Sequence, residues 1–130
     1  MYNTRSVEGC RVQINWNNKE PIYLQLRDRL AELIMDGSLS EGEALPSVRH
    51  ISSEQRINPI TVSKAMQILV DEQLVEKRRG LGMYVVSGAQ DKLAKQERDK
   101  FLNDEWPQIA ERIERLGLDL ATLPRGGKTK

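Results

Sequence analysis

The sequence is short of several kinds of residue, and each shortage narrows what the chain can be. Its one cysteine, Cys10, excludes an intramolecular disulfide and predicts a protein of the reducing cytoplasm. Aromatic residues make up 5% of the 130 residues and hydrophobic residues 38%, which is enough for one modest core and leaves little room for an enclosed ligand cavity. No apolar run approaches the ~20 residues of a membrane span. The N-terminal segment also lacks the apolar core of a signal peptide.

Net charge is nearly absent as well, because 20 Lys and Arg residues face 19 Asp and Glu residues. Overall charge therefore says nothing about binding to nucleic acid, and only the placement of cations can. His50 is the single histidine, and no set of residues has the spacing of metal ligands or of a nucleophile with its base. We therefore expect neither an enzyme nor a protein with a metal or another cofactor.

Helix signals fill the first half of the chain. Pro21 stands where a first helical position is expected, and Asp36-Gly37 provides a stop. The apolar stripe between them consists of Tyr23, Leu26, Leu30, Leu33 and Ile34. A short second helix is predicted from Val48 to about Glu54, with Ser47 as its cap.

A third helix begins at Asn58-Pro59, which combine a cap with a first-turn proline. Its buried face is predicted to consist of Val62, Ala65, Met66 and Leu69. Two strand-like runs follow, residues 74–78 and 83–86, joined by a turn that contains two glycines. Two helices around a tight turn and then a hairpin predict a winged helix-turn-helix. The fold class is therefore α+β, mainly α, with a short C-terminal helical region.

The same elements carry the chemistry that DNA binding needs. The N-terminus of the Asn58 helix favours a phosphate, and Thr61, Ser63 and Lys64 lie within reach of base edges or backbone. Arg49 points outward from the preceding helix, where it could meet a phosphate or a guanine. Residues 77–80 place three cations beside a glycine at the hairpin tip. Each signal has a plainer interpretation as a solvated surface; their order along the chain favours DNA.

The segment after Gly88 is charged and favours helix, and Pro107 is expected to kink or split that helix around residues 103–106. An apolar stripe runs through it, which either folds back on the protein's own core or forms a two-fold interface with a second copy. Large aromatics dominate interface energetics, so Phe101 and Trp106 would be its anchors. The predicted dimerisation residues are Phe101, Leu102, Trp106, Ile109, Ile113 and Leu116.

Four separated motifs resemble those of the GntR family of bacterial transcription regulators. They are residues 21–26 (PIYLQL), 45–49 (LPSVR), 58–65 (NPITVSKA) and 78–85 (RRGLGMYV). The resemblance covers roughly residues 10–86, and the short C-terminal region resembles that of the YtrA-like subfamily. Most other subfamilies carry a large effector-binding domain there, for which this chain has no room.

The resemblance implies a DNA-binding homodimer on an operator with inverted half-sites. The DNA-binding positions that it assigns are Arg49, Asn58, Pro59, Thr61, Ser63, Lys64, Arg79, Gly80 and Gly82. Two residues depart from the family pattern. Arg56 stands where the family usually has glycine, and could add a phosphate contact. Ile60 replaces a usually polar residue and could contact a thymine methyl group. The operator sequence therefore cannot be inferred from those of relatives.

The sequence thus predicts a winged helix-turn-helix domain at residues 10–87, a helical dimerisation tail at 88–124 and a disordered tail at 125–130. The predicted function is a sequence-specific transcriptional regulator in the cytoplasm, most simply a homodimeric repressor. By resemblance, its targets would include its own operon and an ABC transporter. A small-molecule effector would have to bind at the dimer interface or between tail and winged domain. The alternative is a winged-helix module that binds another protein and no operator.

Overall fold

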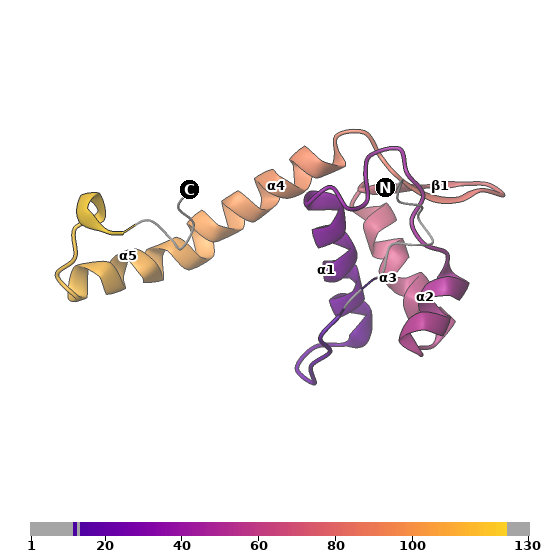
Figure 1. Ribbon diagram of the computed structural model, residues 1–130, viewed down its shortest axis with the longest axis horizontal. Helices are drawn as coiled ribbons and strands as arrows, with labels where there is room; N and C mark the ends of the chain where they lie inside the picture. The colour runs from indigo at the N-terminus through magenta and orange to yellow at the C-terminus, as the bar shows by residue number, and fades with distance from the viewer. Residues whose placement is uncertain (1–11, 13, 125–130) are drawn as a thin grey trace. The chain divides into compact units, whose positions relative to one another are not determined.

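The computed structural model describes residue 12 and residues 14–124, which form two compact units that meet after Ala94 (Figure 1). Cys10, the first residues of the predicted winged domain and the predicted disordered tail at 125–130 lie outside the described residues. The division falls inside helix α4 (Ala89–Lys100) rather than before it. Ala89 and Leu93 explain this position, because both are buried in the core of the first unit.

The first unit contains the three predicted helices, α1 (Ile22–Met35), α2 (Val48–Gln55) and α3 (Pro59–Asp71). Pro21 immediately precedes α1 instead of opening it. Ser47 caps α2 and Asn58 caps α3, as predicted. The buried residues of α3 are the four that its spacing predicted.

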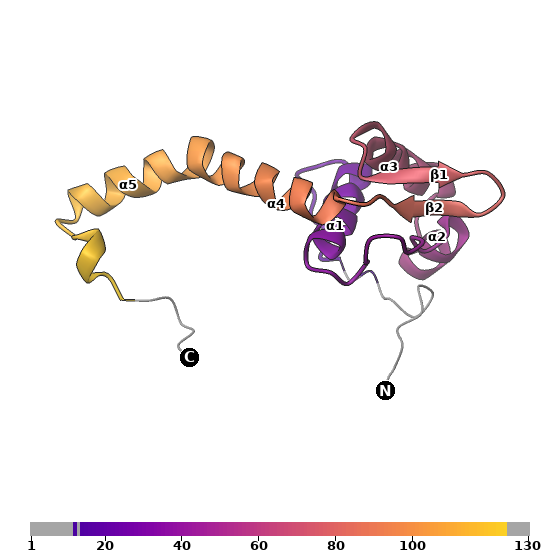
Figure 2. The ribbon, with the colours of Figure 1, turned by 90° about the horizontal axis from the view of Figure 1, so that it is seen from above.

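The hairpin consists of β1 (Val75–Arg78) and β2 (Gly82–Val85), which pair antiparallel with Val75 opposite Val85 and Arg78 opposite Gly82 (Figure 2). Gly80 and Gly82 both adopt positive φ, +76° and +114°, a conformation that costs glycine little and other residues much. The loop before α2 also reaches the sheet: Ala44 forms an isolated bridge with Tyr84, and the Leu45 N–H donates to the Met83 carbonyl at 2.8 Å. Neither a helix nor a strand was predicted between Gly37 and Ser47.

One core fills the first unit, and α1, α3 and the hairpin supply most of it. Gln55 Nε2 donates to the carbonyl of Val12, which ties this buried residue to α2. The buried hydrophobic residues are Val12, Leu26, Leu30, Ala31, Leu33, Ile34, Leu39, Leu45, Ile51, Val62, Ala65, Met66, Leu69, Leu74, Val75, Val85, Ala89 and Leu93. This core fixes α2, α3 and the hairpin in one arrangement.

An ion pair joins α1 to the end of α3. Arg27 donates from Nε and Nη2 to Glu72 Oε1 at 2.9 and 2.6 Å, and from Nη1 to Asp28 at 3.0 Å. Burial alone would lower the pKa of Arg27, but the hydrogen bonds to the two carboxylates outweigh it and raise that pKa. Lys92 of α4 donates to the Glu72 carbonyl at 2.6 Å, so the beginning of α4 is bound to the same point.

Arg56 ends α2 in the left-handed conformation, with φ 57° and ψ 49°. A side chain with a Cβ atom pays about 1–2 kcal/mol for this conformation, which explains why glycine suits the position. We predict that Arg56→Gly raises the free energy of unfolding by about 1 kcal/mol, less than that penalty because glycine is also freer in the unfolded chain.

Urea denaturation of the full chain measures this change. Arg56→Ala is the matched control, because it removes the guanidinium and keeps the Cβ atom, and it should leave the stability close to that of the wild type. Equal stability for the glycine and alanine variants would contradict the account of strain at this position.

The second unit continues α4 through a π-helical turn (Phe101–Glu105) into α5 (Trp106–Arg115), and a short 3₁₀ turn (Leu120–Thr122) follows. The π-helical turn stands where Pro107 was predicted to disturb the helix. The proline ring collides with the carbonyl four residues earlier, and a wider turn relieves that clash. The Trp106 N–H accordingly donates to the Phe101 carbonyl, five residues back.

Candidate nucleic-acid interface

Capping side chains define the two helices of the helix-turn-helix. Ser47 Oγ accepts from the His50 N–H at 3.0 Å, and Asn58 Oδ1 accepts from the Ile60 N–H at 2.8 Å. Ser52 Oγ donates to the Ile57 carbonyl at 2.6 Å and closes the turn between them. Asn58 and Pro59 are exposed, so the N-terminus of α3 faces solvent with the partial positive charge of its free N–H groups.

The first turns of α3 present a mixed surface. Ser63 and Lys64 are exposed and Thr61 is half-buried. Ile60 is 75% exposed, the most exposed of the large hydrophobic side chains that the structure describes. Lys64 extends toward α1, where its Nζ lies 4.0 Å from the centre of the Tyr23 ring. Sequence spacing placed Lys64 on the exposed arc but could not show this cation–π contact.

The three cations of the hairpin have different surroundings. Arg78 stacks over Tyr84, 4.2 Å from the ring centre, and its Nε donates to Glu76 at 2.9 Å. Lys77 and Arg79 are exposed, and within the described residues no ion pair or hydrogen bond engages their side chains. Arg78 therefore stiffens the hairpin, whereas Lys77 and Arg79 are available to an anionic partner.

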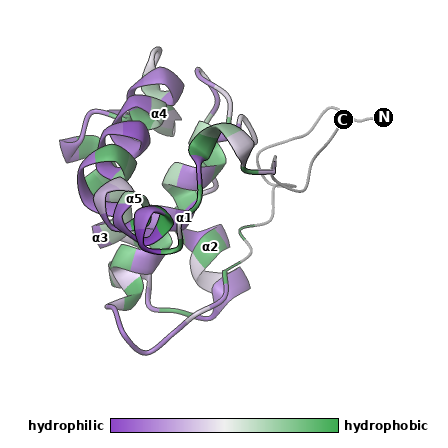
Figure 3. Cartoon of the chain, turned by 90° about the vertical axis from the view of Figure 1, so that its left-hand side faces the viewer, coloured by the Kyte–Doolittle hydropathy of each residue, from purple (hydrophilic) through white to green (hydrophobic). Residues whose placement is uncertain are grey.

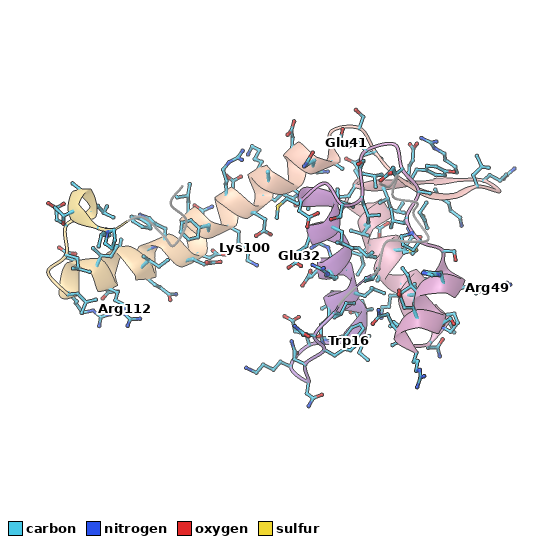
Figure 4. The ribbon with its side chains drawn as sticks, in the orientation of Figure 1. Trp16, Glu32, Glu41, Arg49, Lys100 and Arg112 are labelled. Carbon is cyan, nitrogen blue, oxygen red and sulfur yellow. The ribbon has the colours of Figure 1, made fainter. Side chains whose placement is uncertain are left out.

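Arg49 on α2 is likewise available to an anionic partner. It is exposed, and among the residues described no ion pair or hydrogen bond holds its side chain. Figure 4 shows it on the outer side of α2, turned away from α1. A guanidinium in this state can bind a phosphate or a guanine edge without first losing another partner.

A hollow of about 500 Å³ brings α3 and the hairpin together, with the loop before α2 as its third wall. Of the nine predicted DNA-binding residues, Ser63, Gly80 and Gly82 line it. The other six do not: Arg49, Asn58, Pro59, Thr61, Lys64 and Arg79. Leu81 also lines it and is 66% exposed at the hairpin tip. Sequence reasoning did not single out Leu81, although an apolar residue between two turn glycines was a usable signal.

A family model of bacterial regulatory proteins, the gntR family, matches residues 22–85. The structure of YtrA from Sulfolobus acidocaldarius, a GntR-family transcription factor, is 33% identical with a TM-score of 0.55, and the match covers 70% of this chain and 96% of that one. The chain belongs to the GntR family. The predicted family and the winged helix-turn-helix fold are thereby confirmed.

This GntR-family chain is also similar to two bacterial transcriptional regulators. A transcriptional regulator from Oenococcus oeni has a TM-score of 0.66 and 31% identity, over 78% of this chain and 84% of that one. The HTH-type transcriptional repressor YtrA of Bacillus subtilis (strain 168) is 38% identical over 82 residues. Those residues are 63% of this chain and 63% of YtrA, so the match spans less than two thirds of the relative. Both YtrA comparisons support the YtrA-like subfamily.

The described part of this GntR-family chain contains neither a membrane-spanning helix nor a cluster of metal ligands. No helix among residues 14–124 is long and apolar enough to cross a membrane. The same residues contain no group of three or more His, Cys, Asp or Glu that could hold a metal ion.

Proposed function

We propose that this chain is a DNA-binding transcriptional regulator that acts as a homodimeric repressor on an inverted-repeat operator. The observation that carries the proposal is the hollow that α3 shares with the hairpin. Ser63 of α3 and Lys77, Gly80 and Gly82 of the hairpin line this hollow, so the helix and the hairpin would face one ligand together. The exposed N-terminus of α3, Arg49 and Arg79 lie outside the hollow and would extend the contact to neighbouring phosphates.

In the proposed complex, the N-terminal half of α3 lies in the major groove. Its free N–H groups meet a phosphate, and Thr61 and Ser63 face base edges. Ile60 would contact a thymine methyl group. The hairpin would follow the backbone into the adjacent minor groove, where Arg79 supplies positive charge to a strongly negative channel.

The second part of the proposal is the dimer. One winged domain contacts too few phosphates and bases for tight, specific binding, whereas two on half-sites about one helical turn apart reach nanomolar affinity. The tail offers the surface that joins them: Leu102 is 55% exposed and Leu116 is 62% exposed. A second copy of the chain would cover this apolar stripe. The alternative, in which the stripe folds back on its own core, predicts a monomer.

Repression would follow from occupancy of a promoter by the dimer, in the cytoplasm where the DNA lies. The Bacillus subtilis relative is named a transcriptional repressor. By family resemblance, we propose that the operator controls the chain's own operon and an ABC transporter. An effector that bound at the dimer interface would change the spacing of the two winged domains and release the DNA.

Fluorescence anisotropy tests the proposed function. The full chain is titrated onto labelled DNA from upstream of its own gene, with excess nonspecific competitor and over a series of salt concentrations. We expect binding that survives the competitor, weakens steeply with salt and saturates at two chains per site. Binding no stronger than to the competitor would contradict the proposed operator and favour a winged-helix module that binds another protein.

A further inference from the structure

A groove beside α5 is lined by opposite charges at its two ends. The groove, of about 490 Å³, runs along one side of the helix, with Gln108 and Ile109 at its middle. Asp104 and Glu105 line one end of this α5 groove, and Arg112 and Arg115 line the other. Figure 4 shows Arg112 projecting from the helix into solvent.

None of these charges is paired with another residue that the structure describes. No ion pair or hydrogen bond among residues 14–124 involves the side chain of Asp104, Glu105, Arg112 or Arg115. The acidic and basic ends are about two helical turns apart, roughly 10 Å at 1.5 Å per residue, too far for Glu105 and Arg112 to pair with each other. A partner that covers the groove must therefore bring its own charges in the opposite order.

A second copy of the same helix has that order when it runs antiparallel. Ile109 lies near the midpoint of both Glu105–Arg112 and Asp104–Arg115. A two-fold axis beside Ile109 would place Glu105 against the partner's Arg112, and Arg112 against the partner's Glu105. In a parallel pair, each residue on this flank of the seam would instead face the opposite flank of the partner helix, so Glu105 and Arg112 would not meet. Charges that flank an apolar seam decide the orientation of paired helices in this way.

The apolar stripe fits the same axis. Figure 3 shows hydrophobic and hydrophilic residues alternating around α4 and α5. Leu102 and Leu116 lie equally far from Ile109 on either side, so each would meet the other's copy. Trp106 would pack between the partner's Ile109 and Ile113. The face is thus complementary to itself in the order of its apolar and charged residues, as an isologous interface requires.

We infer that two copies of the chain pair antiparallel through α5, with the two-fold axis beside Ile109 and reciprocal Glu105–Arg112 contacts across it. This inference rests on the proposed homodimer and adds its orientation and register. The charges contribute modestly to affinity because they are exposed, and their main effect is to favour the antiparallel arrangement and to fix its register.

A charge-swapped chain provides the test. The double variant Glu105→Arg, Arg112→Glu keeps the net charge and should form homodimers as stable as the wild type, because each contact is inverted and still attractive. When the full-length variant is mixed with wild-type chain, the antiparallel heterodimer would contain only like-charge contacts. We expect native mass spectrometry at low salt to find heterodimers about tenfold below the statistical ratio.

The control exchanges charges outside the α5 groove. Glu111 and Arg98 are both exposed and line no part of it, so Glu111→Arg, Arg98→Glu should mix at random with the wild type. Random mixing with the Glu105 and Arg112 swap, as a parallel pair would give, or an excess of heterodimers would show that these residues do not make the reciprocal contact. Either result overturns the inference and leaves the homodimer standing. A wild-type chain that is monomeric at micromolar concentration would overturn the homodimer itself.

Discussion

Trp106→Ala is expected to raise the dimer dissociation constant at least about 100-fold and to abolish operator binding at nanomolar protein. Aromatic anchors at the centre of an interface cost about 2–4 kcal/mol each when truncated, and a two-fold interface loses the anchor twice. Trp106 is half-buried in the chain and contacts Phe101, with 6.4 Å between the ring centres. A partner would bury the remainder of its surface.

Sedimentation equilibrium measures the dimer constant, and anisotropy on a complete operator and on a single half-site measures its effect on DNA binding. The variant should bind the single half-site as the wild type does, since the winged unit is untouched. Leu120→Ala is the matched control, because Leu120 is an exposed apolar residue of the same unit outside the stripe. If the Trp106→Ala chain remained dimeric, the apolar stripe of the tail would not be part of the dimer interface.

Arg49→Ala is expected to reduce operator affinity about 100-fold, with the dimer intact. A specific arginine contact contributes about 1–3 kcal/mol, and the dimer carries two copies of it. If Arg49 binds phosphate, the slope of log affinity against log salt should fall by about 2, one for each copy. Arg49→Lys separates the two roles, because lysine retains a phosphate contact and loses bidentate contact with guanine.

Arg98→Ala is the charge-matched control for Arg49, since it removes one exposed arginine from α4 and should change neither affinity nor salt slope. Circular dichroism of both variants checks that the helices are retained. Arg49→Ala binding within twofold of the wild type, with the same salt slope, would show that α2 does not approach the DNA.

Local signals were sufficient to predict the winged unit. Ser47 and Asn58-Pro59 predicted where α2 and α3 begin, because a capping side chain and a first-turn proline act within one helical turn. The four buried residues of α3 followed from its 3.6-residue period. The hairpin followed from two glycines between strand-like runs, and the structure gives both of them positive φ.

Contacts between distant segments could not be predicted in this way. The bridge between Ala44 and Tyr84 joins a loop to a strand that lies forty residues later. Lys64 stacks on Tyr23, and Arg78 is held by Tyr84 and Glu76. Each depends on how α1, α3 and the hairpin pack, which no local pattern encodes.

The predicted boundary between winged domain and tail shows the same limit. The change of composition at Gly88 placed it before α4, whereas the compact units meet after Ala94. Ala89 and Leu93 complete the core of the winged unit, and hydrogen bonds from Gln90 to the Met35 carbonyl and from Lys92 to the Glu72 carbonyl fix the first turns of α4 to it. The assignment of the remaining tail to dimerisation stays a prediction.

Selection of bound sequences from a pool of random duplex DNA tests the central claim most directly, because it assumes no operator. Full-length protein is used at a concentration where the proposed dimer is populated, and the selected DNA is sequenced. We expect an inverted repeat with half-sites about one helical turn apart, each containing a thymine at the position that meets Ile60. Enrichment of a single unrepeated site, or no enrichment above the starting pool, would contradict a homodimer that reads an operator.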